Sequence, residues 1–442
     1  MLTDDQDTGL TKYMPRVRRR LESKGVSFAN AFASYPLCCP SRATLLSGQY
    51  ADNHGVLANE QAGELDLRNS LPVWLKRSGY LTSYIGKFLN GYPIKGEPLL
   101  DPPGWDDFAS PAVAVTDMYH YKLLRNGALR SYGSKHPNYK TDVLGGFALE
   151  SLQRLTAAEE PFFMTFAPTA PHAELHVEAC NDPRSSPASR NRFREIDAPR
   201  KGAFNETKIG DKPRHVRAFP ELDEQQLDLI DCHHRARARS VLDVDRYVGQ
   251  MLDVLERAGE LDNTFVIFTS DNGFLTGQHR IPSGKVLPYD EATRVPLIVR
   301  GPGIPEGIER RQLVSNVDWA ATILDIAGAR SGRVLDGLSL LAAARDNESA
   351  RGRELLLEAG RSEPYPGNRA PAYQALRTSR WLYVEYEDRQ RELYDVRADP
   401  DQANNLAAQG GAKKIRAALR ERLDVLRDCA GAACRVGLTA PG

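Results

Sequence analysis

One short segment holds the residue types best suited to nucleophilic chemistry on an anion: Cys38-Cys39-Pro40-Ser41-Arg42. Pro40 suits the first turn of a helix, and residues 43–46 continue a helix well. Cys38 would then lie at a helix N-terminus, where free backbone N–H groups favour an anion. Arg42 adds a planar cation one turn further along, matched to the oxygens of sulfate or phosphate. Taken alone, Cys38 also fits a plain thiolate nucleophile or a buried apolar cysteine in a turn.

Two pairs of oxygen-bearing side chains have the character of metal ligands: Asp4-Asp5 and Asp271-Asn272. Hard oxygen ligands in a flexible arrangement suit Ca²⁺, and a cation would hold an anionic substrate and stabilise an oxygen nucleophile. Without further context, acids near an N-terminus are typical of a solvated end, and Asp-Asn-Gly is typical of a turn.

Alternating strands and helices must position these residues through roughly the first three quarters of the chain. Apolar runs at 161–167, 264–269 and 295–299 predict buried strands. A helix precedes the second run, and Gly259 follows it as a stop; its apolar residues recur at helical spacing: Val241, Val244, Val248, Met251, Leu252 and Leu255. In such sheets ligands gather at the carboxyl ends of strands, and both Asp271-Asn272 and Pro171-His172 lie just past a predicted strand end.

The chain is expected to form two domains. Residues 1–340 predict an α/β catalytic domain with a large mixed, mostly parallel sheet sandwiched by helices. Residues 341–442 predict a smaller α+β domain with an antiparallel sheet, including a strand at 381–386 and a helix at about 412–426. The Pro-, Arg- and Asn-rich stretch 180–220 is interpreted as a surface excursion bordering the site.

Composition excludes several classes of protein. The 442 residues carry a formal net charge of zero, which argues against nucleic acid or an anionic membrane as partner. An anionic substrate must therefore be held by a local cluster of cations. No apolar run approaches the ~20 residues needed to span a bilayer. The six cysteines include no CxxC pair, so a zinc site is not expected; Cys429 and Cys434 fit a small disulfide or two free thiols equally well.

The Cys38 segment, with its Leu46-Ser47-Gly48 ending, resembles the sulfatase signature at every fixed position. In that family the first cysteine is oxidised by a formylglycine-generating enzyme to formylglycine (3-oxoalanine), whose hydrate attacks sulfur. The resemblance implies this fate for Cys38 and a sulfate-binding role for Arg42. Residues 79–89 resemble the second sulfatase signature, which implies that Lys87 contacts the sulfate.

The same resemblance implies the remaining site residues. Asp4-Asp5 and Asp271-Asn272 match the contexts of the family's two metal pairs, so Asp4, Asp5, Asp271, Asn272 and modified Cys38 are expected to bind Ca²⁺. His172 resembles the histidine that binds sulfate and protonates the leaving oxygen. Lys285 resembles a second sulfate-binding lysine. His279, in the same loop, is a candidate for substrate contact, and His54 matches a family context or is structural.

Two departures from the family pattern stand out. Leu89 occupies the position where many sulfatases carry a histidine, so Asn90 is predicted to take part of that residue's role in the second half-reaction. The opening strand that the family places before the Asp-Asp pair is expected to be missing, with a truncated start that hides a signal peptide. A secreted or extracytoplasmic location is expected from the resemblance.

The resemblance covers nearly the whole chain, from Leu2 to Asp395, and is greatest to N-acetylglucosamine-6-sulfatase and bacterial arylsulfatase-like members. It implies hydrolysis of a sulfate monoester on a sugar such as N-acetylglucosamine 6-sulfate or on a sulfated glycan. Two alternatives stay open: a phosphate or phosphonate ester hydrolase of the same superfamily, the alkaline phosphatase superfamily, and a sulfated-glycan-binding homologue that has lost catalysis.

Overall fold

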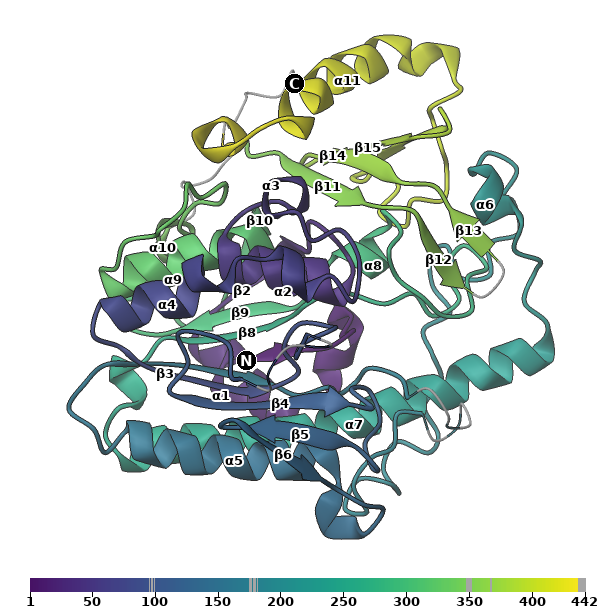
Figure 1. Ribbon diagram of the computed structural model, residues 1–442. Coiled ribbons are helices and arrows are strands. Elements are labelled where there is room, and N and C mark those ends of the chain that lie inside the picture. Colours follow the sequence, from purple (N-terminus) through teal and green to yellow (C-terminus); the bar gives the residue numbers. More distant parts are fainter. Residues whose placement is uncertain are drawn as a thin grey trace.

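The computed structural model describes residues 1–94, 96, 98, 100–174, 177, 180, 182–346, 352–365 and 368–435. Two five-stranded sheets form its centre (Figure 1). The first has the order β1 (Leu2–Thr3), β8 (Val266–Ser270), β9 (Leu297–Arg300), β2 (Val26–Phe32) and β10 (Ile308–Ser315). The second has the order β6 (Ala128–Ser131), β5 (Lys122–Arg125), β4 (Asp107–Val113), β3 (Leu81–Gly86) and β7 (Phe162–Ala167).

Parallel and antiparallel pairings both occur, which confirms a mixed sheet. The parallel pairs are β1 with β8, β2 with β10, and β3 with both β4 and β7; the antiparallel pairs are β8 with β9, β2 with β9, β4 with β5 and β5 with β6. The two sheets join where β1 lies beside β7, and the Asp4 N–H donates to the Ala170 carbonyl there over 3.4 Å. The carboxyl ends of strands from both sheets therefore meet at one place.

Helices cover both faces of this double sheet (Figure 1). The helices are α1 (Pro15–Arg20), α2 (Cys38–Ser47), α3 (Ala51–His54), α4 (Leu71–Arg77), α5 (Lys140–Leu155), α6 (Arg214–Arg217), α7 (Glu224–Arg257), α8 (Asp290–Thr293), α9 (Trp319–Ala327), α10 (Leu341–Arg345) and α11 (Lys413–Arg427). One apolar cluster packs α1, α5 and α7 on one face. Further clusters pack α2, α4, α9 and α10 on the other face, which confirms the predicted sandwich.

The predicted strands at 161–167, 264–269 and 295–299 correspond to β7, β8 and β9. The predicted helix is the C-terminal half of α7, which begins much earlier, at Glu224. Its start carries a capping box, since the Asp223 side chain accepts from Gln226 N and the Gln226 side chain accepts from Asp223 N. Gly259 follows the helix with a φ of 76°, as expected of a glycine stop.

The expectation that the opening strand is missing is wrong. Leu2 and Thr3 form β1, parallel to β8, with Leu2 opposite Thr269 and Thr3 opposite Ser270. Two residues suffice because neighbouring bonds extend the pairing: the Met1 amino group donates to the Ile267 carbonyl over 2.8 Å. A largely apolar cavity of about 590 Å³ is lined by residues of β7 and β8 together with Met1 and Leu2. The join between the sheets is thus concentrated at the carboxyl ends of these strands.

A smaller antiparallel sheet follows in the C-terminal part, as predicted. Its order is β11 (Leu355–Ala359), β14 (Tyr373–Arg377), β15 (Trp381–Tyr386) and β16 (Arg391–Asp395), and a separate pair joins β12 (Ser362–Tyr365) to β13 (Asn368–Ala370). Helix α11 packs against the four-stranded sheet. The domain boundary at residue 340 stays a prediction.

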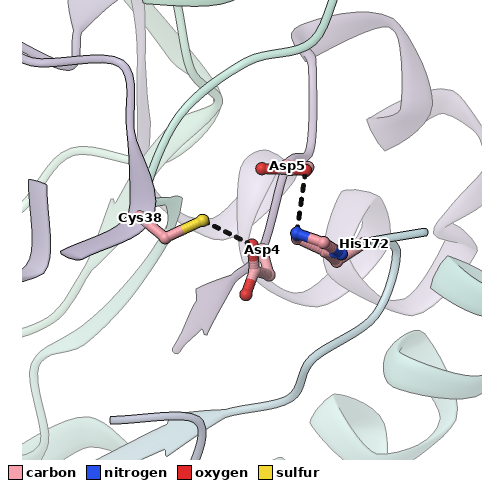
Figure 2. Close-up of side chains that lie close together, drawn as sticks. All are labelled: Asp4, Asp5, Cys38 and His172. Carbon is pink, nitrogen blue, oxygen red and sulfur yellow. Dashed lines mark hydrogen bonds and ion pairs between the residues drawn. The ribbon is translucent and has the colours of Figure 1, made fainter. Parts of the chain in front are cut away.

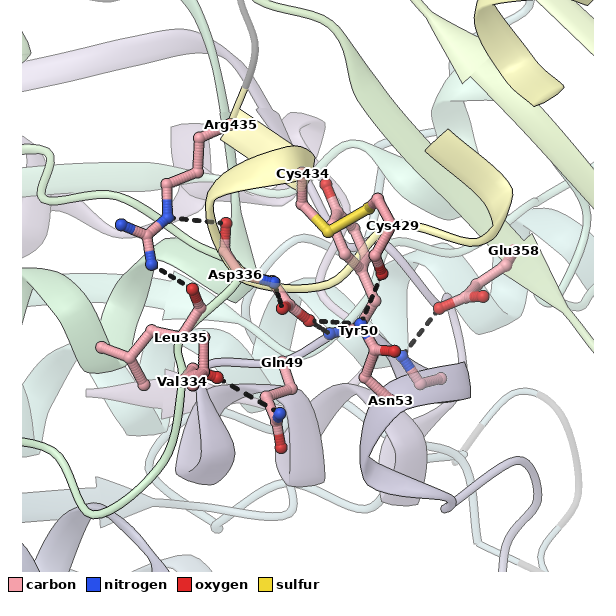
Figure 3. The surroundings of a disulfide bond; sticks show 12 residues. Gln49, Tyr50, Asn53, Val334, Leu335, Asp336, Glu358, Cys429, Cys434 and Arg435 are labelled. Atoms are coloured by element: carbon pink, nitrogen blue, oxygen red, sulfur yellow. Dashed lines mark hydrogen bonds between the residues drawn. A yellow bond between two sulfur atoms is a disulfide. The ribbon is translucent and has the colours of Figure 1, made fainter. Parts of the chain in front are cut away.

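Two disulfides are present, Cys429–Cys434 and Cys180–Cys232. The first closes a loop that docks on α3 (Figure 3). Asp336 binds both partners of this contact, since its carboxylate accepts from Gly431 N at 2.6 Å and from Asn53 Nδ2 at 2.8 Å. Of the two options left open for Cys429 and Cys434, the disulfide is therefore the one observed.

Candidate functional site

The site lies where the carboxyl ends of several strands face the start of α2. Asp4 and Asp5 follow β1, Lys87 follows β3, and His172 comes after β7. Asp271 and Asn272 follow β8 directly. Helix α2 begins at Cys38, after an extended Leu37 (φ −146°), so Cys38 lies at a helix N-terminus as predicted.

Asp4 is the hub of one half of the site. Its Oδ1 accepts from Cys38 Sγ at 3.5 Å, the contact drawn in Figure 2. Its Oδ2 lies 2.5 Å from Lys87 Nζ and 3.3 Å from Arg42 Nη2. All four side chains are buried. The helix start, the β3 end and the β1 end are therefore held together through one carboxylate.

Asp5 organises the other half. Its Oδ1 accepts from Asn272 Nδ2 at 2.7 Å and from Lys285 Nζ. Its Oδ2 lies 3.5 Å from His172 Nε2, the contact drawn in Figure 2. Lys285 Nζ also lies 2.8 Å from Cys38 Sγ. The loop that carries Lys285 thus reaches Cys38, and the sulfate-binding role of Lys285 stays a prediction.

Asp271 completes a balanced set of charges. Its Oδ2 accepts from Arg42 Nε at 2.9 Å, and its Oδ1 accepts from Asp5 N at 3.1 Å. Arg42, Lys87 and Lys285 supply three cations that are paired with the carboxylates of Asp4, Asp5 and Asp271. Before any ligand binds, these charges neutralise one another.

Burial and neighbouring charges shift the titration of these groups. Burial, with Asp4 beside it, raises the pKa of the Cys38 thiol to about 12, so the unmodified side chain is a neutral thiol at pH 7. Burial alone would raise the pKa of Asp5, but Lys285 and His172 bring it down to about 2. Burial lowers the pKa of His172, and Asp5 and Asp4 oppose that shift.

The carboxylate and amide oxygens of Asp4, Asp5, Asp271 and Asn272 suit a hard divalent cation, whereas the Cys38 thiol and the His172 imidazole beside them are softer donors. Ligand atoms of Asp4, Asp5, Cys38 and His172 all lie within 4.8 Å of one another. Asn272 is fully buried, and its Oδ1 has no hydrogen-bond partner among the residues that the structure describes. A buried amide oxygen without a partner beside three carboxylates is the chemistry that an oxygen-preferring ion such as Ca²⁺ satisfies.

The remaining predicted residues lie elsewhere. His279 is fully buried: its Nδ1 lies 3.0 Å from Glu206 Oε2, and its ring stacks on Tyr289 with 3.9 Å between centroids. It therefore supports the Lys285 loop from behind and is not open to a substrate in this structure. The Asn90 carbonyl accepts from Cys39 Sγ at 3.6 Å.

The two positions that carried open questions in the sequence are structural. His54 Nε2 lies 3.0 Å from Thr44 Oγ1, and its Nδ1 accepts from Val56 N at 3.1 Å, so His54 braces α2 from behind. Leu89 is buried in an apolar cluster with Cys39. A leucine there extends the core under α2.

Several supporting residues were missed from the sequence. Ser41 Oγ donates to the Asp271 carbonyl at 2.5 Å, and Asn316 Nδ2 donates to Ser41 Oγ at 3.0 Å. Arg237 of α7 donates to the Asp5 carbonyl. Ser41 had a signal, since it stands inside the Cys38 segment. Asn316 and Arg237 had none, because they are separated from their partners by 275 and 232 residues.

The family model described as Sulfatase matches residues 2–329, and the model described as N-sulphoglucosamine sulphohydrolase, C-terminal, matches residues 277–429. The chain is 32% identical to N-acetylglucosamine-6-sulfatase of Homo sapiens, covering 100% of this chain and 86% of the relative. It is 31% identical to an arylsulfatase of Volvox carteri, covering 98% of this chain and 75% of the relative.

Solved structures share the fold. A protein solved with its substrate D-glucosamine-2-N,6-O-disulfate superposes with a TM-score of 0.79 at 22% identity, covering 96% of each chain. The phosphonate monoester hydrolase of Agrobacterium radiobacter superposes with a TM-score of 0.74 at 21% identity, covering 96% of this chain and 94% of that one. Among the helices that the structure describes, none has the length and apolar character needed to cross a membrane.

Proposed function

This chain belongs to the sulfatase family and is a sulfuric ester hydrolase, and we propose that it removes sulfate from a sugar such as N-acetylglucosamine 6-sulfate or from a sulfated glycan. The observation that carries this proposal is the convergence of Cys38, three cations and three carboxylates at the start of α2. Action on a sulfated sugar is supported by the relative N-acetylglucosamine-6-sulfatase, because the match covers 100% of this chain and 86% of that relative.

We propose that Cys38 is converted to formylglycine by a maturation enzyme of the formylglycine-generating type, and that Asp4, Asp5, Asp271, Asn272 and modified Cys38 hold Ca²⁺. When present, the modified residue supplies a hydrated aldehyde as oxygen nucleophile, and the ion stabilises charge on that oxygen and on the sulfate. The neutral state of the buried Cys38 thiol is consistent with a need for modification.

The three cations are proposed to bind the sulfate oxygens. Arg42 and Lys87 are almost fully buried, so their charges act in a medium of low dielectric constant, where they stabilise an anion strongly. Lys285 reaches the nucleophile position from the opposite side of the site. Because the side-chain charges balance before ligands bind, a divalent cation would leave the site net positive, as capture of an anionic ester requires.

His172 is proposed to protonate the leaving alcohol oxygen, because its imidazole lies beside Asp5 and within 4.8 Å of Cys38 Sγ. In its deprotonated form the same imidazole would be placed to accept a proton from a hydroxyl group of the modified residue 38. This assignment accounts for Leu89 in place of a second histidine. Asn90 can orient a hydroxyl group, but its amide cannot take up a proton.

An extracytoplasmic location is proposed as well. The two disulfides, Cys180–Cys232 and Cys429–Cys434, are typical of oxidising compartments. A relative from Drosophila melanogaster is named an extracellular sulfatase and matches 77% of this chain, although the chain covers only 30% of that relative.

The C-terminal domain and the excursion at 180–220 are proposed to shape the sugar pocket.

A panel of sulfate, phosphate and phosphonate esters tests the reaction class. Nitrophenyl sulfate, nitrophenyl phosphate and a phenyl phosphonate ester are compared with 6-O-sulfated glucosamines, using protein co-produced with a formylglycine-generating enzyme. We expect the sulfate esters to be turned over fastest and the 6-O-sulfated sugar to give the highest kcat/KM. Faster phosphonate turnover would favour the alternative suggested by the phosphonate monoester hydrolase fold. Sugar binding with no turnover would instead favour a binding homologue.

A further inference from the structure

The Asp4-Asp5 pair poses a backbone problem. Successive residues of an extended chain point to opposite sides, yet both carboxylates enter the same site. The chain solves this by placing Asp5 in the left-handed region, with a φ of 60°. For a residue with a side chain this conformation is unfavourable, so the surroundings must hold it.

Charged side chains bind both the backbone N–H and the backbone carbonyl of Asp5. Its N–H donates to Asp271 Oδ1 at 3.1 Å, inside the site. Its carbonyl accepts from Arg237 Nη2, which comes from α7 outside the ring of proposed metal ligands. Arg237 is only 1% exposed. A buried guanidinium aimed at one carbonyl next to a proposed ligand is well placed to set the direction of that ligand.

Arg237 also joins the two chain segments that carry the proposed ligands. Its Nη1 lies 3.0 Å from Asp7 Oδ2, two residues beyond Asp5. Its guanidinium lies over the Phe274 ring, 4.7 Å from the centroid, two residues beyond Asn272. One rigid, planar group therefore contacts the segment after Asp4-Asp5 and the segment after Asp271-Asn272.

We infer that Arg237 is a positioning residue for the metal site: it fixes the Asp5 turn and its distance from the Asp271-Asn272 segment, and so sets the affinity for Ca²⁺. This inference rests on the proposed Ca²⁺ site. Neighbouring arginines of α7 have a different task. Arg235 donates to the Ile196 carbonyl at 2.6 Å, and Arg239 donates to the Cys180 carbonyl at 3.0 Å, so both tether the excursion.

The test measures Ca²⁺ affinity by titration calorimetry, with Tb³⁺ luminescence as an independent probe, on the full-length protein. Loss of a residue that orients a metal ligand typically weakens metal affinity about 10–100-fold. We expect this loss in Arg237→Met, with Arg237→Lys in between because an ammonium can replace only one of the contacts. Arg239→Met is the matched control, and its Ca²⁺ affinity should stay within about twofold of that of the protein without substitutions.

The outcomes separate this inference from the proposed function. If the protein without substitutions binds no Ca²⁺, the metal site and the inference both fail. If that protein binds Ca²⁺ and Arg237→Met binds it equally well, only the inference is overturned. Should Arg237→Met fail to fold, Arg237→Lys decides: a lower thermal midpoint with unchanged Ca²⁺ affinity would mean that Arg237 only stabilises the fold, whereas weaker affinity in the folded protein supports the inference.

Discussion

Replacing Asp4 with asparagine removes one charge from the site and keeps the shape of the side chain. Asp4 Oδ2 lies 2.5 Å from Lys87 Nζ and 3.3 Å from Arg42 Nη2. After the substitution Arg42 still has Asp271 Oδ2 at 2.9 Å from its Nε. Lys87 loses its partner, since Asp4 is the carboxylate with which it is paired among the described residues.

The expected cost follows from the burial of Lys87, which is 1% exposed. Removing one partner of a buried ion pair destabilises a protein by roughly 3–5 kcal/mol, because a buried charge is left uncompensated. Burial lowers the pKa of Lys87 and Asp4 raises it, with a net rise in the native protein. In Asp4→Asn that support is gone, so Lys87 can lose its proton and recover part of the cost. We expect a loss of about 3 kcal/mol at pH 7.

Urea denaturation in the presence of EGTA measures this difference without a contribution from the metal. The matched control is Asp142→Asn, because Asp142 pairs with Arg246 at 2.5 Å while both side chains are partly exposed. A pair of this kind contributes about 0–1 kcal/mol. If the free energy of unfolding of Asp4→Asn falls no further than that of the control, the account of Asp4 as the counter-ion of Lys87 is wrong.

Three further predictions concern acid, the Lys285 loop and the metal. Burial, with Arg333 nearby, lowers the pKa of His54 from 6.5 to about 3. The stabilisation that neutral His54 gives to the folded protein is therefore complete above pH 6.5 and is lost as the pH falls toward 3. His54→Gln should flatten that part of the stability curve by at most about 5 kcal/mol, and an unchanged slope in urea titrations at several pH values would contradict this. His279→Gln, which loses the ring that stacks on Tyr289, should lower kcat/KM on nitrophenyl sulfate about tenfold by loosening Lys285, whereas unchanged kinetics would show that the loop does not need this support. Ca²⁺ at 100 times its Kd should raise the free energy of unfolding by about 2.7 kcal/mol over EGTA-treated protein, and equal thermal midpoints would rule out a native-state metal site.

Local sequence signals predicted that Cys38 begins a helix and that Asp271 follows a strand. Pro40 and the residues after it indicated a helix start at Cys38, and α2 begins there. The apolar run before Asp271 indicated a strand, and β8 ends at Ser270. These signals work because a helix cap and a buried strand are decided by a few neighbouring residues.

Contacts between distant segments could not be predicted in the same way. Arg237 and Asp5 are 232 residues apart, and no periodicity or motif links them. His279 looked like a substrate ligand because it is close to Lys285 in sequence, but the loop turns its ring into the core against Tyr289. The two-residue β1 was missed because so short a strand has no pattern of its own; its pairing with β8 creates it.

The identity of residue 38 in active protein decides whether formylglycine is the nucleophile. Protein produced with and without a formylglycine-generating enzyme is assayed on nitrophenyl sulfate, and the peptide containing Cys38 is then analysed by mass spectrometry. We predict that turnover rises in proportion to the fraction of chains carrying the aldehyde at position 38, and that Cys38→Ala is inactive under both conditions. Full activity in protein whose Cys38 is an unmodified thiol would contradict it.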